Sequence, residues 1–191
     1  MSVSEQVKSF TASKIQRILA DPSDSAARAS LARLRRGIGH TPGEMPELWG
    51  EFLLDMPEEL MGHGSPSHAE WAVYIALTTF ALHQQGHERR ADPVHKQGVS
   101  LGTAARRLME SEDDRERVAR RFYPVATASD MAALSHHLRS LVMLLSAKGI
   151  PLDYVRLASD LLFLQNPASA DRVRLRWGED FCRLAKDENK D

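Results

Sequence analysis

The stretch from Trp71 to Leu82 constrains the fold more than any other part of the chain, because it is apolar on nearly every side of a helix. Ser67 and Glu70, three residues apart, form the capping-box pattern that starts a helix just before it. A helix that is apolar all round must lie at the centre of a bundle, covered by other helices. We therefore expect a helix over 68–85 that is buried by several neighbours.

The rest of the chain also has helical periodicity, without the sustained apolar–polar alternation that strands require. We predict an all-α protein of two packed helical bundles with roughly eight to nine helices. Capping and breaking residues place the other helices at 4–20, 24–37, from 46, 101–109, 112–123, 129–149, 151–165 and 169–184.

The clearest internal linker is the stretch 86–100, which holds Gly86, Pro93 and Gly98 among polar residues. We therefore expect an N-terminal bundle over 1–88, a linker over 89–99 and a C-terminal bundle over 100–191. The tail over 186–191 is expected to fray.

Composition excludes several classes of protein. Cys182 is the only cysteine, so the chain cannot form an internal disulfide or a zinc site built on several thiolates. Its place beside Phe181 favours packing over reactivity. The first ten residues have no apolar run, and the longest apolar stretch is too short to span a bilayer. We therefore expect a cytoplasmic protein that does not associate with membranes.

Eight histidines raise the question of a metal or acid–base site. His83 and His87 have the spacing that places two imidazoles on one helix face, but Gly86 interrupts that face and no glutamate follows His83. The sequence also lacks a Glu-x-x-His pair, a phosphate-binding glycine loop and a nucleophile elbow. We predict a non-enzymatic protein without metal or cofactor; an enzyme with an unfamiliar helical site is the less favoured alternative.

The net charge of −1 hides an uneven distribution. From Gly37 to Glu88 there is no Lys or Arg, whereas the acidic residues there are Glu44, Glu47, Glu51, Asp55, Glu58, Glu59, Glu70 and Glu88. Among the 25 basic residues Arg outnumbers Lys by 19 to 6, and the planar guanidinium binds phosphate through two parallel hydrogen bonds. A near-neutral chain can therefore carry a strongly basic face. A GC-rich genome would explain the same arginine content equally well.

The basic residues outside the acidic region form candidate contacts to nucleic-acid phosphates. Helical spacing puts one group on the second predicted helix, with Arg33 on a different side, and a stripe on the helix over 112–123. The candidates are Arg28, Arg33, Arg35, Arg36, Lys96, Arg106, Arg107, Arg117, Arg120 and Arg121. Arg89 and Arg90 lie beside Lys96 in the linker, where a mobile loop would reach a backbone. Asp113, Asp114 and Glu116 leave open the alternative that the stripe is an internally neutralised, solvated face.

Several segments, taken in order, resemble the CasB family, the small subunit of the type I-E CRISPR Cascade complex. They are Leu31 to Gly37, Trp71 to Gln84, Ser100-Leu101-Gly102, Arg115 to Tyr123 and Thr127 to Met131. Together they cover most of the chain. The resemblance implies two helical bundles, which fits the linker.

The resemblance also implies a role. In that family two copies of the small subunit lie head to tail in a crRNA-guided complex and contact its backbone and large subunits. They help to hold the guide–target duplex and the displaced strand of the target DNA. Sequence is read by pairing with the guide, so backbone contacts suffice for the small subunit.

Basic positions of the family match Arg33, Arg35, Arg36, Arg106, Arg107, Arg117, Arg120 and Arg121. One departure concerns the helix after Met131, where relatives carry paired arginines and this chain has His136 and His137 with Arg139 nearby. We include Arg139 among the candidates. The alternative from another class is a pure assembly adaptor, in which the acidic region over 44–59 docks a partner and the arginines serve protein contacts.

Overall fold

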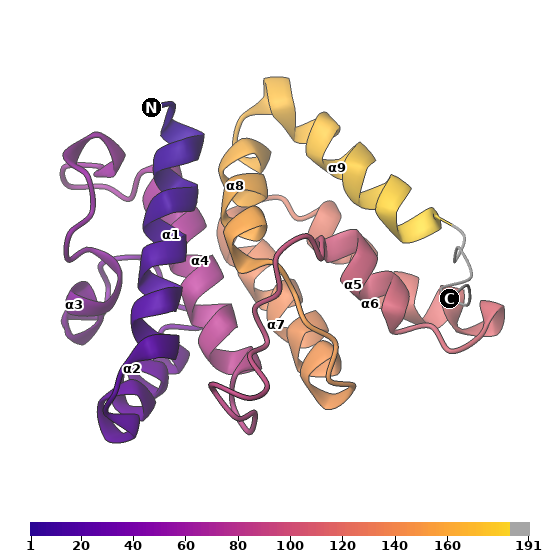
Figure 1. Ribbon diagram of the computed structural model, residues 1–191. Helices are drawn as coiled ribbons and strands as arrows, with labels where there is room; N and C mark the ends of the chain where they lie inside the picture. The colour runs from indigo at the N-terminus through magenta and orange to yellow at the C-terminus, as the bar shows by residue number, and fades with distance from the viewer. Residues whose placement is uncertain (184–191) are drawn as a thin grey trace.

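The computed structural model describes residues 1–183, and within them the protein consists of α-helices joined by short 3₁₀ turns and loops (Figure 1). The helices are α1 (Val3–Ala20), α2 (Asp24–Arg36), α3 (Trp49–Phe52), α4 (His68–His83), α5 (Leu101–Arg107), α6 (Arg115–Ala126), α7 (Met131–Ala147), α8 (Tyr154–Leu164) and α9 (Pro167–Cys182). The only β-type pairing among these residues is one isolated parallel bridge between His95 and Leu152. The all-α prediction is confirmed.

Helix α4 is the centre of the molecule, as its sequence predicts. Ser67 and Glu70 form the expected capping box, with the Ser67 hydroxyl accepting from the Glu70 amide at 3.0 Å and the Glu70 carboxylate accepting from the Ser67 amide at 2.7 Å. Helices α1, α2, α7 and α8 pack around α4, and nearly all its side chains are buried. Figure 1 shows α4 enclosed between α1 and α2 on one side and α7 and α8 on the other.

Helix α8 links the two halves of the chain, because it packs against both α1 and α4 as well as against α9. Pairs α5–α9 and α6–α7 complete the C-terminal half. Buried apolar side chains from both halves form a single hydrophobic core. The division into bundles over 1–88 and 100–191 stays a prediction. In the structure, the helices of both segments contribute to this one core.

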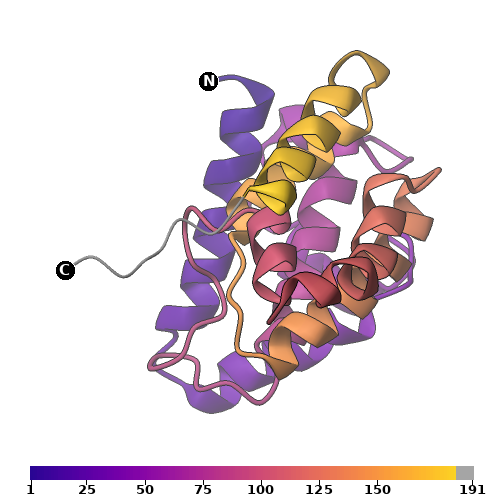
Figure 2. The ribbon, with the colours of Figure 1, turned by 90° about the vertical axis from the view of Figure 1, so that its right-hand side faces the viewer.

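The segment between α4 and α5 runs alongside the stretch that leads into α8, as both ribbon views show (Figures 1 and 2). The Leu152 amide donates to the Val94 carbonyl at 2.9 Å, and the Asp153 amide donates to the Val99 carbonyl at 2.8 Å. Val94, Val99 and Leu152 are buried. Backbone pairing and apolar anchors therefore hold 94–99 against the stretch that leads into α8.

The boundaries of α6, α7, α8 and α9 differ from the sequence predictions. Helix α6 continues through Pro124 to Ala126, since a proline in the last turn costs one hydrogen bond while buried Phe122 and Val125 hold the turn in place. Helix α7 is capped by Asp130 and not by Ser129, because the Asp130 carboxylate accepts from the Ala133 amide at 2.8 Å.

The last two helices also start elsewhere than expected. Helix α8 begins at Tyr154, capped by Asp153, because the residues after Pro151 pair with the segment over 94–99. Helix α9 begins at Pro167 with Asn166 as its cap, ahead of Ser169. Cys182 is exposed, so the prediction that it packs is wrong. Leu184 and the tail over 186–191 lie outside the described residues. Among the residues described, no helix has the length and apolarity needed to cross a bilayer.

Lys14 on α1 is a buried cation whose ammonium has no hydrogen-bond partner among the described residues. It lies 5.2 Å from the centroid of the Phe10 ring. Burial, and then the charge of Arg17, lowers the pKa of Lys14 below its usual 10.5.

We expect Lys14→Met to raise the free energy of unfolding by about 1 kcal/mol near neutral pH, because it removes an uncompensated buried charge. The protonated form of Lys14 is disfavoured on folding, so the wild-type protein gains stability as pH rises from the lowered pKa toward 10.5. The advantage of the variant should shrink over that range. Urea denaturation at several pH values measures both effects, with exposed Lys8→Met as the control; equal effects at the two positions would contradict the prediction.

Gly102 lets α5 approach α9 closely. A Cβ atom at this position would lie 2.2 Å from the Trp177 carbonyl oxygen. Gly102→Ala should therefore cost roughly 2 kcal/mol of stability through overpacking. Gly178, in the interior of α9, has nothing within 4 Å of such a Cβ, so Gly178→Ala should stabilise the protein by about 0.5 kcal/mol. Thermal unfolding of both variants tests the contrast, and two changes of the same sign would refute it.

Candidate nucleic-acid interface

Two adjoining hollows lie between α2, the C-terminal end of α4 and α7. One has a volume of about 640 Å³ and the other about 290 Å³. They share Ala32, Arg35 and Gln85 in their linings, and together we call them the arginine groove. The basic residues that line it are Arg28, Arg35, Arg36, Arg89 and Arg139.

The amphipathic pattern of α2 explains why its arginines face this groove. Ala27, Leu31 and Leu34 form the buried side of the helix and hold it against the core. Arg28 and Arg35 are seven residues apart and therefore share a face. Arg139 comes from α7, more than one hundred residues later, and lines the smaller hollow with Arg35 and Arg36.

The arginines of the groove differ in how their charge is used. Within residues 1–183, Arg28, Arg35 and Arg139 form no ion pair. Arg36 lies 3.9 Å from the Glu47 carboxylate, at the outer limit of an ion pair. Three full positive charges on exposed or half-exposed side chains are thus available to a ligand.

Arg89 is a wall of the groove and not a mobile contact, contrary to the sequence-based expectation. Its guanidinium is buried and donates to the carbonyl oxygens of Ile18 and Leu19 at 2.8 and 2.7 Å. These carbonyls belong to the last turn of α1 and have no hydrogen-bond partner within the helix. It also forms an ion pair with Asp24, and this hydrogen bond lowers the pKa of the Asp24 carboxyl. Sequence alone could not separate Arg89 from the exposed arginines, because its acceptors lie about 70 residues away.

Arg33 does not belong to the groove. Its Nε lies 2.6 Å from the Glu51 carboxylate on α3, which agrees with the prediction that it faces another side of α2. Lys96 is exposed on the segment between α4 and α5 and lines neither hollow.

The arginines of α5 and α6 form a second group, and none of them lines the arginine groove. Arg117 pairs with Asp114 at 2.7 Å and Arg120 pairs with Glu116 at 2.5 Å, so the neutralised-face alternative holds for these two. The Arg106 guanidinium donates to the Arg183 carbonyl oxygen. Arg107 and Arg121 have no such partner among residues 1–183.

The two groups sit on different sides of the fold. Helix α2 packs against α1, α3 and α4, whereas α6 packs against α5 and α7 (Figure 1). The strongly basic face that the sequence allows is thus divided between two places. Of the candidate phosphate contacts named from the sequence, the ones that line the arginine groove are Arg28, Arg35, Arg36 and Arg139.

His83 and His87 are engaged in hydrogen bonds. His83 is fully buried, and its Nδ1 lies 2.8 Å from the Tyr154 hydroxyl. Burial lowers the pKa of His83 to about 4, so the ring is neutral at physiological pH. The Nδ1 of His87 lies 2.7 Å from Asp92. Among the described residues no three His, Cys, Asp or Glu side chains are grouped so that they could hold a metal ion.

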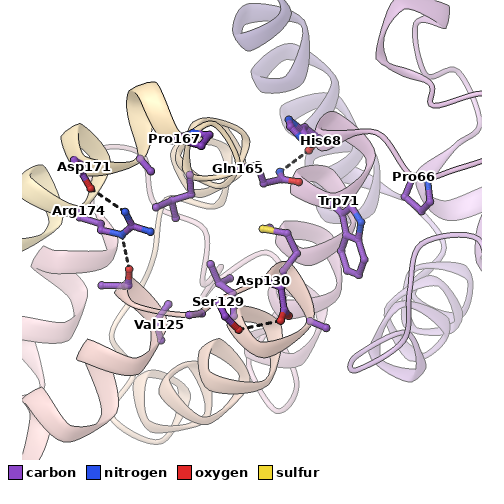
Figure 3. A pocket seen from close by; sticks show the side chains of 17 residues that line it. Pro66, His68, Trp71, Val125, Ser129, Asp130, Gln165, Pro167, Asp171 and Arg174 are labelled. Carbon is purple, nitrogen blue, oxygen red and sulfur yellow. Dashed lines mark hydrogen bonds and ion pairs between the residues drawn. The ribbon is translucent and has the colours of Figure 1, made fainter.

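Another hollow, of about 850 Å³, lies where the N-terminal ends of α4, α7 and α9 meet (Figure 3). Its one arginine, Arg174, donates to the Asp171 carboxylate and to the Ala126 carbonyl, both at 2.9 Å. Its one glutamine, Gln165, donates to the His68 carbonyl at 2.8 Å. The cation in this hollow is therefore committed to the protein itself, which sets it apart from the arginine groove.

Comparison with known proteins gives a consistent result. The family model described as CRISPR-associated protein Cse2 matches residues 30–181. CasB from Thermobifida fusca is 36% identical, with 94% of this chain and 97% of that chain covered and a TM-score of 0.73. A Cse2-family protein from Thermus thermophilus is 24% identical, with 95% and 98% covered and a TM-score of 0.63. CasB from M. ruber is also 24% identical, with 87% and 89% covered and a TM-score of 0.63.

The two structures at 24% identity show the common fold, and no curated protein sequence matches. The family model spans most of the chain, from the middle of α2 to the end of α9, and the Thermobifida fusca protein matches over nearly the full length. The chain belongs to the Cse2, or CasB, family of CRISPR-associated proteins.

Proposed function

We propose that this protein is the non-catalytic small subunit of a crRNA-guided type I-E CRISPR surveillance complex, Cascade, and that it binds nucleic-acid backbone. On this proposal it holds the displaced strand and the guide–target duplex and so stabilises the R-loop. Its partners are the backbone and large subunits, the crRNA, the target DNA and a second copy of itself. Family membership supports the place in the complex.

The observation that carries the binding proposal is the set of unpaired arginines around the arginine groove. A guanidinium that already holds a carboxylate must give up that partner before it binds phosphate, so its net contribution is small. Arg28, Arg35 and Arg139 have no carboxylate to give up among residues 1–183. Each can displace a counterion from a phosphate, which is the main source of sequence-independent affinity.

The groove is suited to backbone contact and not to base reading. Its polar lining consists mainly of arginines, with Gln84, Gln85 and His87 from the end of α4 and the loop after it. Two carboxylates also line it, Asp24, which is paired with Arg89, and Glu88. In a guide-directed complex, base pairing supplies the sequence specificity and the protein needs only phosphate contacts.

The adaptor alternative relies on the acidic region over 44–59, and much of its charge is already used within the protein. Glu51 pairs with Arg33 at 2.5 Å, Asp55 pairs with Arg17 at 3.1 Å, and Glu44 lies 2.7 Å from His40. The region is therefore less strongly acidic in the fold than in the sequence. Salt dependence of nucleic-acid binding separates the two functions, since an adaptor without nucleic-acid contact would show none.

We expect Arg28→Gln combined with Arg35→Gln to weaken binding of single-stranded DNA and to reduce the slope of log K against log salt by about 1.5, because two phosphate contacts are lost. Fluorescence anisotropy over a series of salt concentrations measures both quantities. The control combines Lys8→Gln with Arg172→Gln, which makes the same change in net charge on exposed residues outside the groove. An equal effect of both double variants would show that only net charge matters.

The second group of arginines allows a finer test within one helix. Arg121→Glu should weaken retention of the displaced strand in the assembled complex more than Arg117→Glu, because only Arg117 is already neutralised, by Asp114. Both side chains are exposed, so both variants should fold. Strand retention is measured by nuclease protection of the displaced strand. If Arg117→Glu has the larger effect, the ion pair with Asp114 does not limit that arginine in the complex.

A further inference from the structure

A second surface, away from the arginine groove, has the character of a protein-docking site. The hollow of about 850 Å³ and a smaller one of about 310 Å³ share Pro66 in their linings, so they adjoin. We call the pair the tryptophan trough, because Trp49 lines the smaller hollow and Trp71 lines the larger. Figure 3 shows Trp71 and Pro66 on the same side of the larger hollow.

The walls of the smaller hollow are mainly apolar, those of the larger one are polar and apolar in equal measure, and the fold leaves both partly uncovered. Trp49 is 49% exposed although its neighbour Phe52 is buried. Met131 and Leu164 line the larger hollow and are also only partly buried. Of the three tryptophans only Trp177 lies fully inside the core. Exposed tryptophans beside apolar hollows are typical of the few residues that dominate binding between proteins.

The charges of the trough exclude nucleic acid and favour a basic ligand. Its one cation, Arg174, is committed to Asp171 and a backbone carbonyl. Its other full charges are the carboxylates of Asp130 and Glu70. Hydrogen bonds from the start of α7 lower the pKa of the Asp130 carboxyl, so it stays ionised. A phosphate backbone would be repelled here, whereas Lys or Arg side chains would find acceptors.

We propose that the tryptophan trough docks a segment of another protein subunit that carries apolar side chains flanked by Lys or Arg. The apolar side chains fill the hollows beside Trp49 and Trp71, and the basic ones face the carboxylates at the rim. This inference rests on the proposed function only in that the protein works within an assembly. The nucleic-acid groove and the docking trough then occupy separate surfaces of one rigid core.

Ser65 offers a test in which one position carries both the variant and its control. It lines the smaller hollow, its side chain is exposed, and no hydrogen bond holds its hydroxyl among the described residues. Ser65→Arg should repel a basic segment and lower incorporation of the protein into the complex roughly tenfold, while Ser65→Glu should leave incorporation unchanged or raise it. The protein is co-expressed with crRNA and the other subunits of its complex, and incorporation is measured by native mass spectrometry.

A crosslinker identifies the occupant directly. The photoreactive residue p-benzoylphenylalanine replaces Trp49, and in a control it replaces Leu175, which is 63% exposed on α9. Irradiation of the assembled complex should join position 49 to a peptide of another subunit that contains Lys or Arg beside apolar residues, and the control should not give that product. Digestion and mass spectrometry identify the peptide.

Any of four results would overturn the inference: a crosslink to nucleic acid, a crosslink to a second copy of this chain, no crosslink at position 49, or equal effects of Ser65→Arg and Ser65→Glu. The single-stranded DNA affinity of the isolated Ser65 variants is measured in parallel. Loss of docking with unchanged DNA affinity would separate the trough from the arginine groove, so failure of one proposal would be distinguishable from failure of the other.

Discussion

Burial of α4 on all sides is the constraint on which the rest of the structure depends. Because every side chain of α4 from Ala72 to Ala81 is buried, each polar group among them needs a partner inside the protein. Thr78 and Thr79 turn their hydroxyls back to the carbonyls of Tyr74 and Ile75, and the Tyr74 hydroxyl donates to the Gly37 carbonyl at 2.8 Å. The hydrogen bond from Tyr74 to Gly37 fixes the C-terminal end of α2 against α4. It thereby sets the position of the α2 arginines that line the groove.

The surfaces follow from the same constraint. Helices α1, α2, α7 and α8 each give one face to α4, which leaves their outer faces to solvent or to partners. Arg28, Arg35 and Arg139 lie on such outer faces of α2 and α7, and the spacing between those two helices is held by the helix between them. Where the covering helices end, the starts of α4, α7 and α9 meet and leave the larger hollow of the tryptophan trough.

Sequence periodicity and capping patterns predicted the parts of the fold that depend on local interactions. The central helix, its capping box and the α2 stop at Gly37 all rest on residues a few positions apart. The misplaced boundaries at Pro124 and Pro151 depend on tertiary packing or pairing, whereas the start of α7 was misplaced because two adjacent residues, Ser129 and Asp130, could both cap it.

The candidate interface divides in the same way. Helical spacing showed that Arg28 and Arg35 share a face, and the acidic neighbours of Arg117 and Arg120 already suggested local neutralisation. The sequence could not show that Arg139 joins the α2 arginines or that Arg89 is enclosed by the end of α1. Both depend on segments brought together only by the tertiary fold.

The contact of α8 with α1 has a consequence for how the polypeptide reaches its native state. Ser4 near the start of α1 and Ser159 in α8 lie 155 positions apart, yet their hydroxyl oxygens are 3.0 Å apart. During translation the apolar sides of α1 and α4 stay uncovered until the ribosome has released α8. The N-terminal half therefore cannot bury its apolar surface before α8 has been synthesised. We expect the closure of these long-range contacts to limit the rate of folding.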